Sequence, residues 1–298
     1  MQIMPGYLGY LGPSGTFSEE AAHEFARQAK VPLALQAFST CREIVERTKA
    51  GELAAGILPW ENSITGLVNF SLNLLLETDR CLITAEVVVP VSHSFLVRPD
   101  TDPARVKAVY SHPQALSQCQ QFLDKFFPRA ARISTASTAA AAALVAAGPE
   151  PMAAIGSSSV ARRYGLKIAY EAIQDSANNW TRFVVVAGED NPAEEKAKTA
   201  VVLIPRSHRA VDLPALLSIL AENGVFLLNL SVVPAHRCLG EYFFLLEVEG
   251  HRNSSPLAKA LSQLNERVEY LRILGSFAPA ASPSDRHMVG TLWRERER

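Results

Sequence analysis

The sequence predicts an α/β protein in two parts, a larger α/β region followed by a smaller ferredoxin-like domain. Three observations carry this prediction. From residue 5 to about 189, short apolar runs alternate with helical patterns, which is typical of α/β folds with mostly parallel sheets. Residues 188–200 are charged, contain Pro and Gly and have no apolar period, as expected of a linker. Beyond this linker the apolar pattern restarts in the order βαββαβ, the order of the ferredoxin-like split unit.

In the larger region the predicted strands are short apolar runs, and predicted helices fill most of the intervals between them. The strands are expected at 6–12, 33–38, 54–60, 106–111, 131–136, 152–157, 166–173 and 182–189. The helices are expected at 19–30, 41–50, 68–77, 114–127, 139–147 and 160–164.

One segment, residues 81–99, interrupts this alternation with the letters CLITAEVVVPVSHSFLVRP. The stretch is apolar, too long for one ordinary strand, and contains Pro90 in its middle. A strand that crosses between two lobes explains it, and two sub-domains with a cleft between them would follow. A single bent edge strand explains the stretch equally well, so both arrangements stay open.

The smaller domain contains four predicted strands and two predicted helices. They are expected as strand 200–205, helix 213–224, strands 225–233 and 240–250, helix 255–266 and strand 268–277. From Pro279 the chain is polar and rich in Pro and Ser, which favours a flexible tail. The predicted boundaries are 1–189 for the larger region, 190–198 for the linker, 199–278 for the smaller domain and 279–298 for the tail.

Composition and charge exclude several classes of partner. The chain has 298 residues, of which 48% are hydrophobic and 20% charged, as in an ordinary globular protein. Its formal net charge is -1 and its Lys and Arg are scattered, so we expect no nucleic-acid partner and no membrane surface. No window approaches about 18 uninterrupted apolar residues, and the N-terminus lacks the pattern of a signal peptide. We therefore expect a cytoplasmic protein.

The common motifs for metal, nucleotide and covalent chemistry are missing from the sequence. The four cysteines form no CxxC pair and the seven histidines form no HExxH pattern, so we expect reduced thiols and no metal site. The stretch GYLGPSG lacks the ending of a phosphate-binding loop, and GxSxG does not occur. Any reaction is expected to run without a cofactor, metal or covalent nucleophile, through positioned hydrogen-bond donors and acids.

At five places in the larger region, Ser, Thr or Asn lies where a predicted strand passes into the next segment, which is a helix in most cases. Two of them, Thr16 with Glu19 and Ser111 with Gln114, have the spacing of a capping box. The others are found at 61–63, 137–138 and 157–159. Each is most simply a helix cap. Together they place several helix N-termini at the carboxyl ends of strands, which favours an anionic or strongly polar small ligand.

The stretch NNWTRFVVV, residues 178–186, places a polar cluster at the start of an apolar strand. Val184, Val185 and Val186 indicate a strand that is covered on both faces. The two asparagines before it could make a simple turn, and Thr181 is a good strand residue in any case. Taken alone, the cluster is compatible with a turn and with a functional site.

Several motifs together resemble those of the prephenate dehydratase family. They are YLGPSGTFSEEAA, GILPWENSITGLV, YSHPQALSQCQQFL, YGLKIAYEAIQDSANNWTRFVVV and NGVFLLNLSVVPAHRCLGEYFFLLEVEGH, in the order of the family, over residues 5–277. The resemblance implies a two-lobed catalytic region similar to type 2 periplasmic binding proteins, followed by an ACT regulatory domain. It also implies conversion of prephenate to phenylpyruvate with loss of water and CO2, on the route to L-phenylalanine, without a cofactor.

The resemblance also implies the site residues. The family's catalytic threonine falls on Thr181, whose hydroxyl would hydrogen-bond to the departing hydroxyl of the substrate. The other catalytic positions would be Glu61, Asn62, Ser111 and Gln118, and the substrate-binding positions Thr16, Ser63, Asn179, Arg182 and Phe183. For Ser111 an ordinary helix cap stays open as the less favoured alternative, and Arg182 could equally be a partner in a structural ion pair.

The chain departs from the family pattern at Trp60, Thr65, Leu67, Asn73 and Ala140. These departures leave the choice of substrate open. Arogenate dehydration and a decarboxylation of prephenate that does not form an aromatic ring are alternatives. A non-catalytic sensor of anions on the same fold is an alternative of another class.

The largest departures lie in the smaller domain. Where the family reads RPGAL and ESRP around its amino-acid effector, this chain has residues 209–213 and 231–234, with Val211, Asp212, Leu213 and Ser231 at the altered site. A β-branched residue replaces a glycine and a carboxylate is added, so we expect weak or absent inhibition by phenylalanine, or a response to another ligand, amino-acid effectors included. ACT domains of the family pair side by side, which implies a homodimer or homotetramer.

Overall fold

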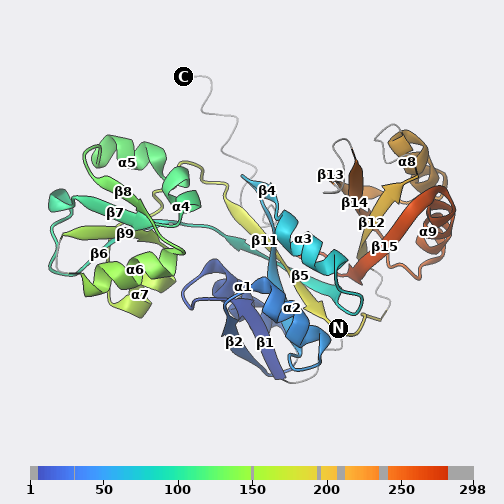
Figure 1. Ribbon diagram of the computed structural model, residues 1–298, viewed down its shortest axis with the longest axis horizontal. Coiled ribbons are helices and arrows are strands. Elements are labelled where there is room, and N and C mark those ends of the chain that lie inside the picture. The colour runs from blue at the N-terminus through green and yellow to red at the C-terminus, as the bar shows by residue number, and fades with distance from the viewer. Residues whose placement is uncertain are drawn as a thin grey trace.

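The chain forms three bodies in a row, a first lobe in the middle with a second lobe on one side and a C-terminal domain on the other (Figure 1). This computed structural model describes residues 6–29, 31–148, 151–192, 196–206, 212–234 and 241–280. The predicted order of a two-lobed α/β region followed by a ferredoxin-like domain is confirmed. No helix among the described residues is long and apolar enough to cross a membrane.

The first lobe is built on a mixed sheet with the strand order β2-β1-β3-β11-β5. Its strands are β1 (Gly6–Leu11), β2 (Leu33–Phe38), β3 (Ala55–Asn62), β5 (Leu82–Pro90) and β11 (Trp180–Ala187), with the short β4 (Gly66–Leu67) beside β3. Its helices are α1 (Phe17–Gln28), α2 (Cys41–Lys49) and α3 (Asn69–Leu76). β11 lies in the sheet between β3 and β5 and runs antiparallel to both.

The second lobe is built on a sheet with the order β10-β6-β9-β7-β8. Its strands are β6 (Ser94–Val97), β7 (Ala108–Ser111), β8 (Ala131–Ser134), β9 (Met152–Gly156) and β10 (Lys167–Tyr170). Its helices are η1 (Pro103–Arg105), α4 (Pro113–Gln118), α5 (Gln120–Phe126), α6 (Thr138–Ala147) and α7 (Ser158–Tyr164). The single helix expected at 114–127 is wrong, because the backbone of Cys119 leaves the helical region and divides it in two.

Residues 81–99 cross from one lobe to the other, as one of the two sequence interpretations proposed. β5 ends at Pro90 in the first sheet, and β6 begins at Ser94 in the second. The chain returns to the first lobe through β11. Because the chain leaves along β5 and comes back along β11, these neighbouring strands run in opposite directions. The expectation of mostly parallel sheets is therefore wrong, and within the described residues parallel pairs occur only around β1 and β7.

The C-terminal domain has the predicted ferredoxin-like arrangement. Its elements are β12 (Lys198–Pro205), α8 (Leu213–Glu222), β13 (Leu227–Pro234), β14 (Tyr242–Glu249), α9 (Ser255–Arg267) and β15 (Val268–Phe277). The antiparallel sheet has the order β13-β14-β12-β15, and both helices cover one of its faces (Figure 1). Side chains such as Leu203, Leu246 and Leu264 form the core between that face and the helices.

The opposite face of this sheet packs on the first lobe, and the two share one hydrophobic core. Leu58 and Val184 of the first lobe belong to the same buried cluster as Val202 and Leu245 of the C-terminal domain. The backbones also approach closely, since a Cβ atom at Gly275 would lie 2.0 Å from the carbonyl oxygen of Ile83.

Two polar side chains add to this junction. Asn191, in the predicted linker, donates from its buried Nδ2 to the carbonyl oxygens of Thr84 and Ser276. Arg272 of β15 donates to the carbonyl oxygens of Leu76 and Thr78. The segment between the domains is therefore partly built into their contact.

Candidate active site

A cavity of about 280 Å³ lies between the two lobes. The first lobe lines it with residues after β1, at the end of β3 and at the start of β11, and the second lobe with the starts of α4 and α6. The polar side chains that line it are Thr16, Ser18, Asn62, His93, His112, Gln114, Gln118, Ser137, Thr138 and Thr181. The carboxyl ends of strands in both lobes therefore face one small, mostly uncharged space.

Three capped helix N-termini border this cavity. Thr16 Oγ1 accepts from the Glu19 N–H at the start of α1, and Ser137 Oγ accepts from the Ala140 N–H at the start of α6. His112 Nδ1 accepts from the Gln114 N–H at the start of α4. Helix N-termini present backbone N–H groups and the positive end of the helix dipole, so this arrangement suits a ligand with negative groups.

Two of the predicted caps are wrong. Pro113 occupies the first position of α4, so the capping position falls on His112, and the Ser111 hydroxyl instead donates to the carbonyl oxygen of Ile155. Asn62 ends β3 and does not begin a helix, because its Oδ1 accepts from the N–H groups of Ile64 and Thr65 in a tight turn.

The Asn62 amide fixes the hydroxyl of Thr181. Because Oδ1 of Asn62 accepts two backbone N–H groups, its other atom must be the NH₂ group. That Nδ2 lies 3.0 Å from Thr181 Oγ1 and from the Trp180 carbonyl oxygen, and 2.8 Å from Asn179 Oδ1, so its two protons are shared among three acceptors. An amide nitrogen can only donate, so the threonine oxygen accepts there and keeps its own proton for another acceptor. Since Thr181 lines the cavity, its hydroxyl can donate to a ligand.

A chain of side-chain amides continues from Asn62 across the cleft. Asn179 Oδ1 accepts from Asn62 Nδ2 at 2.8 Å, and Asn179 Nδ2 donates to Gln118 Oε1 at 3.0 Å. His93 Nε2 lies 3.1 Å from the same Gln118 oxygen. Asn62 belongs to the first lobe and Gln118 to the second, so this chain couples the geometry of the two lobes around Thr181.

His93 is a cavity residue that the sequence analysis missed. The acceptor role of Gln118 Oε1 places the proton of His93 on Nε2 and leaves Nδ1 as an acceptor. That Nδ1 and the Gln118 Nε2 are buried and have no hydrogen-bond partner among the described residues. Burial lowers the pKa of His93, although the bond to Gln118 acts the other way, so the ring is neutral at pH 7. The sequence could have indicated His93, because this residue lies in the segment that one of the two sequence interpretations places across the lobes. A segment that joins two lobes must border their cleft.

The structure brings some of the predicted site residues to the cavity and leaves others outside it. Four of them line it, namely Thr16, Asn62, Gln118 and Thr181, and Asn179 lies directly behind them. Glu61 and Arg182 point to the other face of the sheet, where they pair with each other. This follows from the alternation of side chains along β3 and β11.

The remaining predicted residues support the site from outside. Ser63 holds the start of β11, because its hydroxyl accepts from the Trp180 N–H and donates to the Asn178 carbonyl oxygen. Ser111 is fully buried at the end of β7, and Phe183 is part of the core of the first lobe. Among the described residues, no group of three or more His, Cys, Asp or Glu side chains could hold a metal ion.

The altered site of the C-terminal domain is partly described. Asp212 is at the N-cap of α8, Leu213 begins that helix, and Ser231 lies in β13 opposite Leu245. Val211 lies outside the described residues.

Comparisons with known proteins agree on one family. A family model for prephenate dehydratase matches residues 8–191. The chain is 35% identical over 277 residues to the bifunctional chorismate mutase/prephenate dehydratase of Neisseria gonorrhoeae, covering 93% of this chain and 75% of that protein. It is 34% identical over 275 residues to the prephenate dehydratase of Amycolatopsis methanolica, covering 92% and 88%.

Two solved structures resemble nearly the whole chain. Prephenate dehydratase from Arthrobacter aurescens, in complex with L-Phe, matches with a TM-score of 0.81 and 31% identity, over 92% of this chain and 90% of that one. GqqA, described as a novel type of quorum quenching acylase, matches with a TM-score of 0.78 and 26% identity, over 95% and 100%. The same architecture therefore carries more than one described activity, and the chemistry has to be argued from the cavity.

Proposed function

This chain belongs to the prephenate dehydratase family, and on that premise we propose that it converts prephenate to phenylpyruvate with Thr181 as the catalytic hydrogen-bond donor. The reaction would make it a carbon–oxygen lyase of L-phenylalanine biosynthesis. The observation that carries the proposal is the Thr181 hydroxyl, which accepts from Asn62 Nδ2 and therefore has its proton free at the cavity wall.

The charge of the substrate fits the walls of the cavity. Prephenate carries two carboxylates, and the N-termini of α1, α4 and α6 border the space that would hold them. Both lobes contribute to this set, so a substrate that bridges them would also hold the cleft closed. Ser137 and Thr138 are the hydroxyl groups that we assign to carboxylate binding. Thr16 is assigned to shaping the N-terminus of α1 at the cavity, because its hydroxyl donates its proton to the Leu11 carbonyl oxygen.

The reaction needs a donor at one oxygen and no covalent intermediate. The bond from the ring to its carboxylate breaks and releases CO2, and that electron pair enters the ring as the bond between C4 and the hydroxyl oxygen breaks. The departing oxygen takes a proton and leaves as water, while the ring becomes aromatic. A threonine hydroxyl is too weak an acid to give up its proton outright, so Thr181 stabilises the developing charge by a hydrogen bond and the proton comes from solvent.

Asn62 and its partners are assigned to positioning. The bonds from Asn62 to Thr181 and to Asn179 hold the hydroxyl in one place, so no reorganisation is needed as charge develops. His93 is neutral, which leaves the helix N-termini as the positive groups of the cavity.

The test is to incubate the purified protein with prephenate and to follow phenylpyruvate by its absorbance in base. Conversion at enzymatic rates supports the proposal. Release of CO2 without an aromatic product would instead indicate a non-aromatising decarboxylase, and turnover of arogenate in preference to prephenate would indicate arogenate dehydration. Binding of prephenate without any product would identify a sensor of anions.

We also propose that the protein is a cytoplasmic homodimer or homotetramer that pairs through its C-terminal domain. β13 is an edge strand of the C-terminal sheet, and Leu228 and Val232 on it are exposed by 53% and 49%. Phe226, just before the strand, is 70% exposed. An exposed apolar edge of this kind pairs readily with another strand. Light scattering should show a smaller species for Leu228→Lys, and an unchanged mass would place the contact elsewhere.

The C-terminal domain is further proposed to bind an amino acid weakly. The Arthrobacter aurescens relative was solved in complex with L-Phe. In this chain Asp212 adds a carboxylate at the start of α8, where the carboxylate of an amino acid would be repelled. We therefore assign the domain an effector other than phenylalanine or a reduced response to it.

A further inference from the structure

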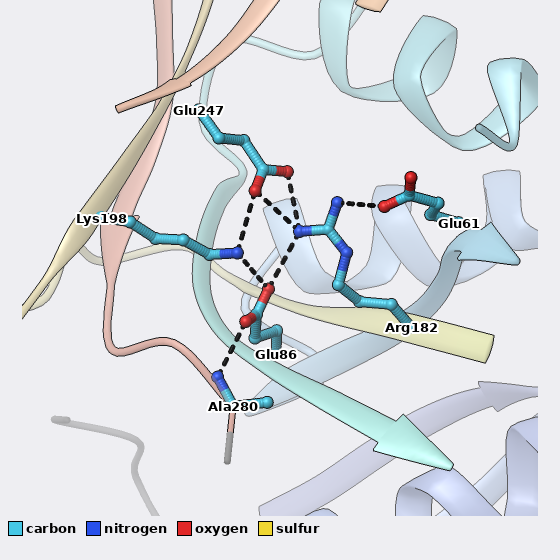
Figure 2. A network of polar contacts seen from close by, with 6 residues as sticks. All are labelled: Glu61, Glu86, Arg182, Lys198, Glu247 and Ala280. Atoms are coloured by element: carbon cyan, nitrogen blue, oxygen red, sulfur yellow. Dashed lines mark hydrogen bonds and ion pairs between the residues drawn. The ribbon is translucent and has the colours of Figure 1, made fainter. Parts of the chain in front are cut away.

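A buried group of charged side chains joins the first lobe to the C-terminal domain (Figure 2). We call it the ion network; it consists of Glu61, Glu86, Arg182, Lys198 and Glu247. Arg182 lies 2.5 Å from Glu61, 3.1 Å from Glu86 and 2.7 Å from Glu247, as nitrogen to oxygen distances. Lys198 Nζ lies 2.7 Å from Glu86 and 2.9 Å from Glu247. The first lobe supplies Glu61, Glu86 and Arg182, and the C-terminal domain supplies the other two.

Four of the five side chains of the ion network are almost entirely removed from solvent, and the fifth, Glu61, is 35% exposed. The side chains of Glu86 and Glu247 are each 4% exposed, that of Lys198 8% and that of Arg182 12%. Burial alone would lower the pKa of Arg182, but the charges of Glu247, Glu86 and Glu61 outweigh it and raise the pKa. Burial would raise the pKa of Glu247, and Arg182 and Lys198 lower it. Arg182 and Glu247 therefore stay charged, and a buried charge that loses its partner is strongly destabilising.

The backbone beside Arg182 is irregular. Arg182 pairs with Glu61 across β3 and β11, but the next residue, Phe183, pairs with Pro59. The ladder thus skips Trp60, which makes a bulge directly beside the pair of Arg182 with Glu61 and one pair away from Thr181 and Asn62. A proline cannot donate to a ladder, so β3 pairs with this end of β11 less regularly than β5, which pairs with it in unbroken register from Trp180 to Val185. The irregularity is confined to the β3 side, and the side-chain contacts of Arg182 to β3, β5 and β14 hold β11 there in addition to the ladder with β5.

We propose that Arg182 is a positioning residue, and that the C-terminal domain fixes Thr181 through it by supplying Lys198 and Glu247. The inference rests on the proposed catalytic role of Thr181. Neighbouring residues of a strand are about 3.3 Å apart and point to opposite faces, so a displaced Arg182 displaces Thr181 from the cavity wall. A displacement of about 1 Å at a catalytic group costs on the order of 100-fold in rate.

The test is to change the charge of the ion network at Lys198, a residue that the C-terminal domain supplies. Three glutamates, one arginine and one lysine give a formal charge of -1, from +2 and -3. Lys198→Met changes it to -2 and leaves Glu86 and Glu247 to repel each other beside Arg182. We expect kcat to fall about 10-fold or more with KM within about 2-fold, because the changed residue is remote from the substrate. Amide hydrogen exchange should become faster in residues 180–184.

The double variant Lys198→Met, Glu247→Gln returns the formal charge to that of the wild type. It should recover most of the lost kcat, which a purely structural role of Lys198 would not produce. A double variant whose kcat is as low as that of Lys198→Met, or lower, would contradict the proposal. Where Lys198→Met does not accumulate as folded protein, the isosteric Glu247→Gln takes its place. It should accelerate exchange in 180–184 and lower kcat several-fold, and an unchanged kcat and exchange would overturn the inference.

Arg272→Met is the matched control at the same junction. Arg272 anchors the C-terminal domain to the carbonyl oxygens of Leu76 and Thr78 and does not touch the ion network. Its loss should leave kcat within about 2-fold. An equal fall of kcat in Arg272→Met would show that only general docking matters and would overturn the role of Arg182. If wild-type protein did not convert prephenate, the proposed function would fail, while the exchange of residues 180–184 would still decide whether the ion network holds β11.

Discussion

The first lobe meets its two neighbours in different ways. Toward the second lobe it presents a cavity, the polar chain from Asn62 through Asn179 to Gln118, and one hydrogen bond from Ser159 to Glu20. Toward the C-terminal domain it presents a continuous apolar core and a buried ion network. Polar groups at the cleft can exchange protein partners for water or substrate at small net cost, whereas separating an apolar core exposes its whole surface. The cleft is therefore the junction that can open, and the other is fixed.

The same two strands serve both junctions. In β3, Asn62 points to the cavity and Glu61 to the C-terminal domain; in β11, Thr181 and Arg182 divide in the same way. A change at one face of these strands is thus one residue away from the other face.

The fixed junction should unfold as one unit with the first lobe. Leu245 is 1% exposed in the shared core, and Leu245→Ala should lower the free energy of unfolding by about 2–5 kcal/mol. Hydrogen exchange should rise in β3 and β11 as well as in β14. The matched control is Leu123→Ala, a fully buried leucine in the core of the second lobe, which should raise exchange in that lobe alone. Unchanged protection of β11 in Leu245→Ala would show two independent units.

On the cleft side, removing the hydroxyl of Thr181 should abolish most of the activity. Thr181→Val keeps the shape of the side chain and should lower kcat by about 100-fold or more, as for loss of a donor to developing charge. Thr181→Ser keeps the hydroxyl and should retain most of the wild-type kcat. Thr84→Val is the control, because Thr84 is a buried threonine of the neighbouring β5 that donates to the Val185 carbonyl oxygen. A Thr181→Val variant with normal kcat would remove Thr181 from the reaction.

Acid should disturb the two junctions in sequence. Burial lowers the pKa of His93 below its usual 6.5, so the folded state resists protonation and loses stability as the pH falls below that value. Arg182 and Lys198 overcome the effect of burial and lower the pKa of Glu247 below its usual 4.5, so its contribution is present above 4.5 and disappears only at lower pH. Thermal melts from pH 7 to 3 should show a first drop of the melting temperature that is missing in His93→Gln. A second drop, at lower pH, should be missing in Glu247→Gln. The reverse order would contradict this assignment.

The smallest effect is expected from L-phenylalanine. Calorimetric titration should show no micromolar binding and assays little inhibition, because Val211 and Asp212 replace the small residues of the family motif. Changing residues 210–212 to Pro-Gly-Ala restores that motif and should strengthen binding. Micromolar affinity of the wild type, coupled to loss of activity, would refute the prediction.

Local patterns in the sequence predicted the parts of the molecule that depend on neighbours in the chain. The βαββαβ order and the caps at Thr16 and Ser137 follow from short-range spacing. For residues 81–99 the same kind of pattern left a crossing strand and a bent edge strand equally open. The direction of β11 does not follow from such spacing, because it depends on where the chain returns after the second lobe. Glu61 and Arg182 were grouped with Asn62 and Thr181 because they adjoin them in the motifs, whereas strand alternation separates their side chains. The ion network could not be predicted, since Lys198 and Glu247 come from another domain.

The position of the second lobe within the chain has a consequence for protein synthesis. Its sheet is complete once residue 170 has left the ribosome, because all of its strands lie between residues 94 and 170. The sheet of the first lobe must wait for β11, and its core stays uncovered until β15 ends at Phe277. A nascent chain therefore carries a finished second lobe beside an unfinished first lobe with exposed apolar surface. Chaperones that bind such surface should therefore act late in translation, and they should act on the first lobe, although its synthesis begins before that of the second.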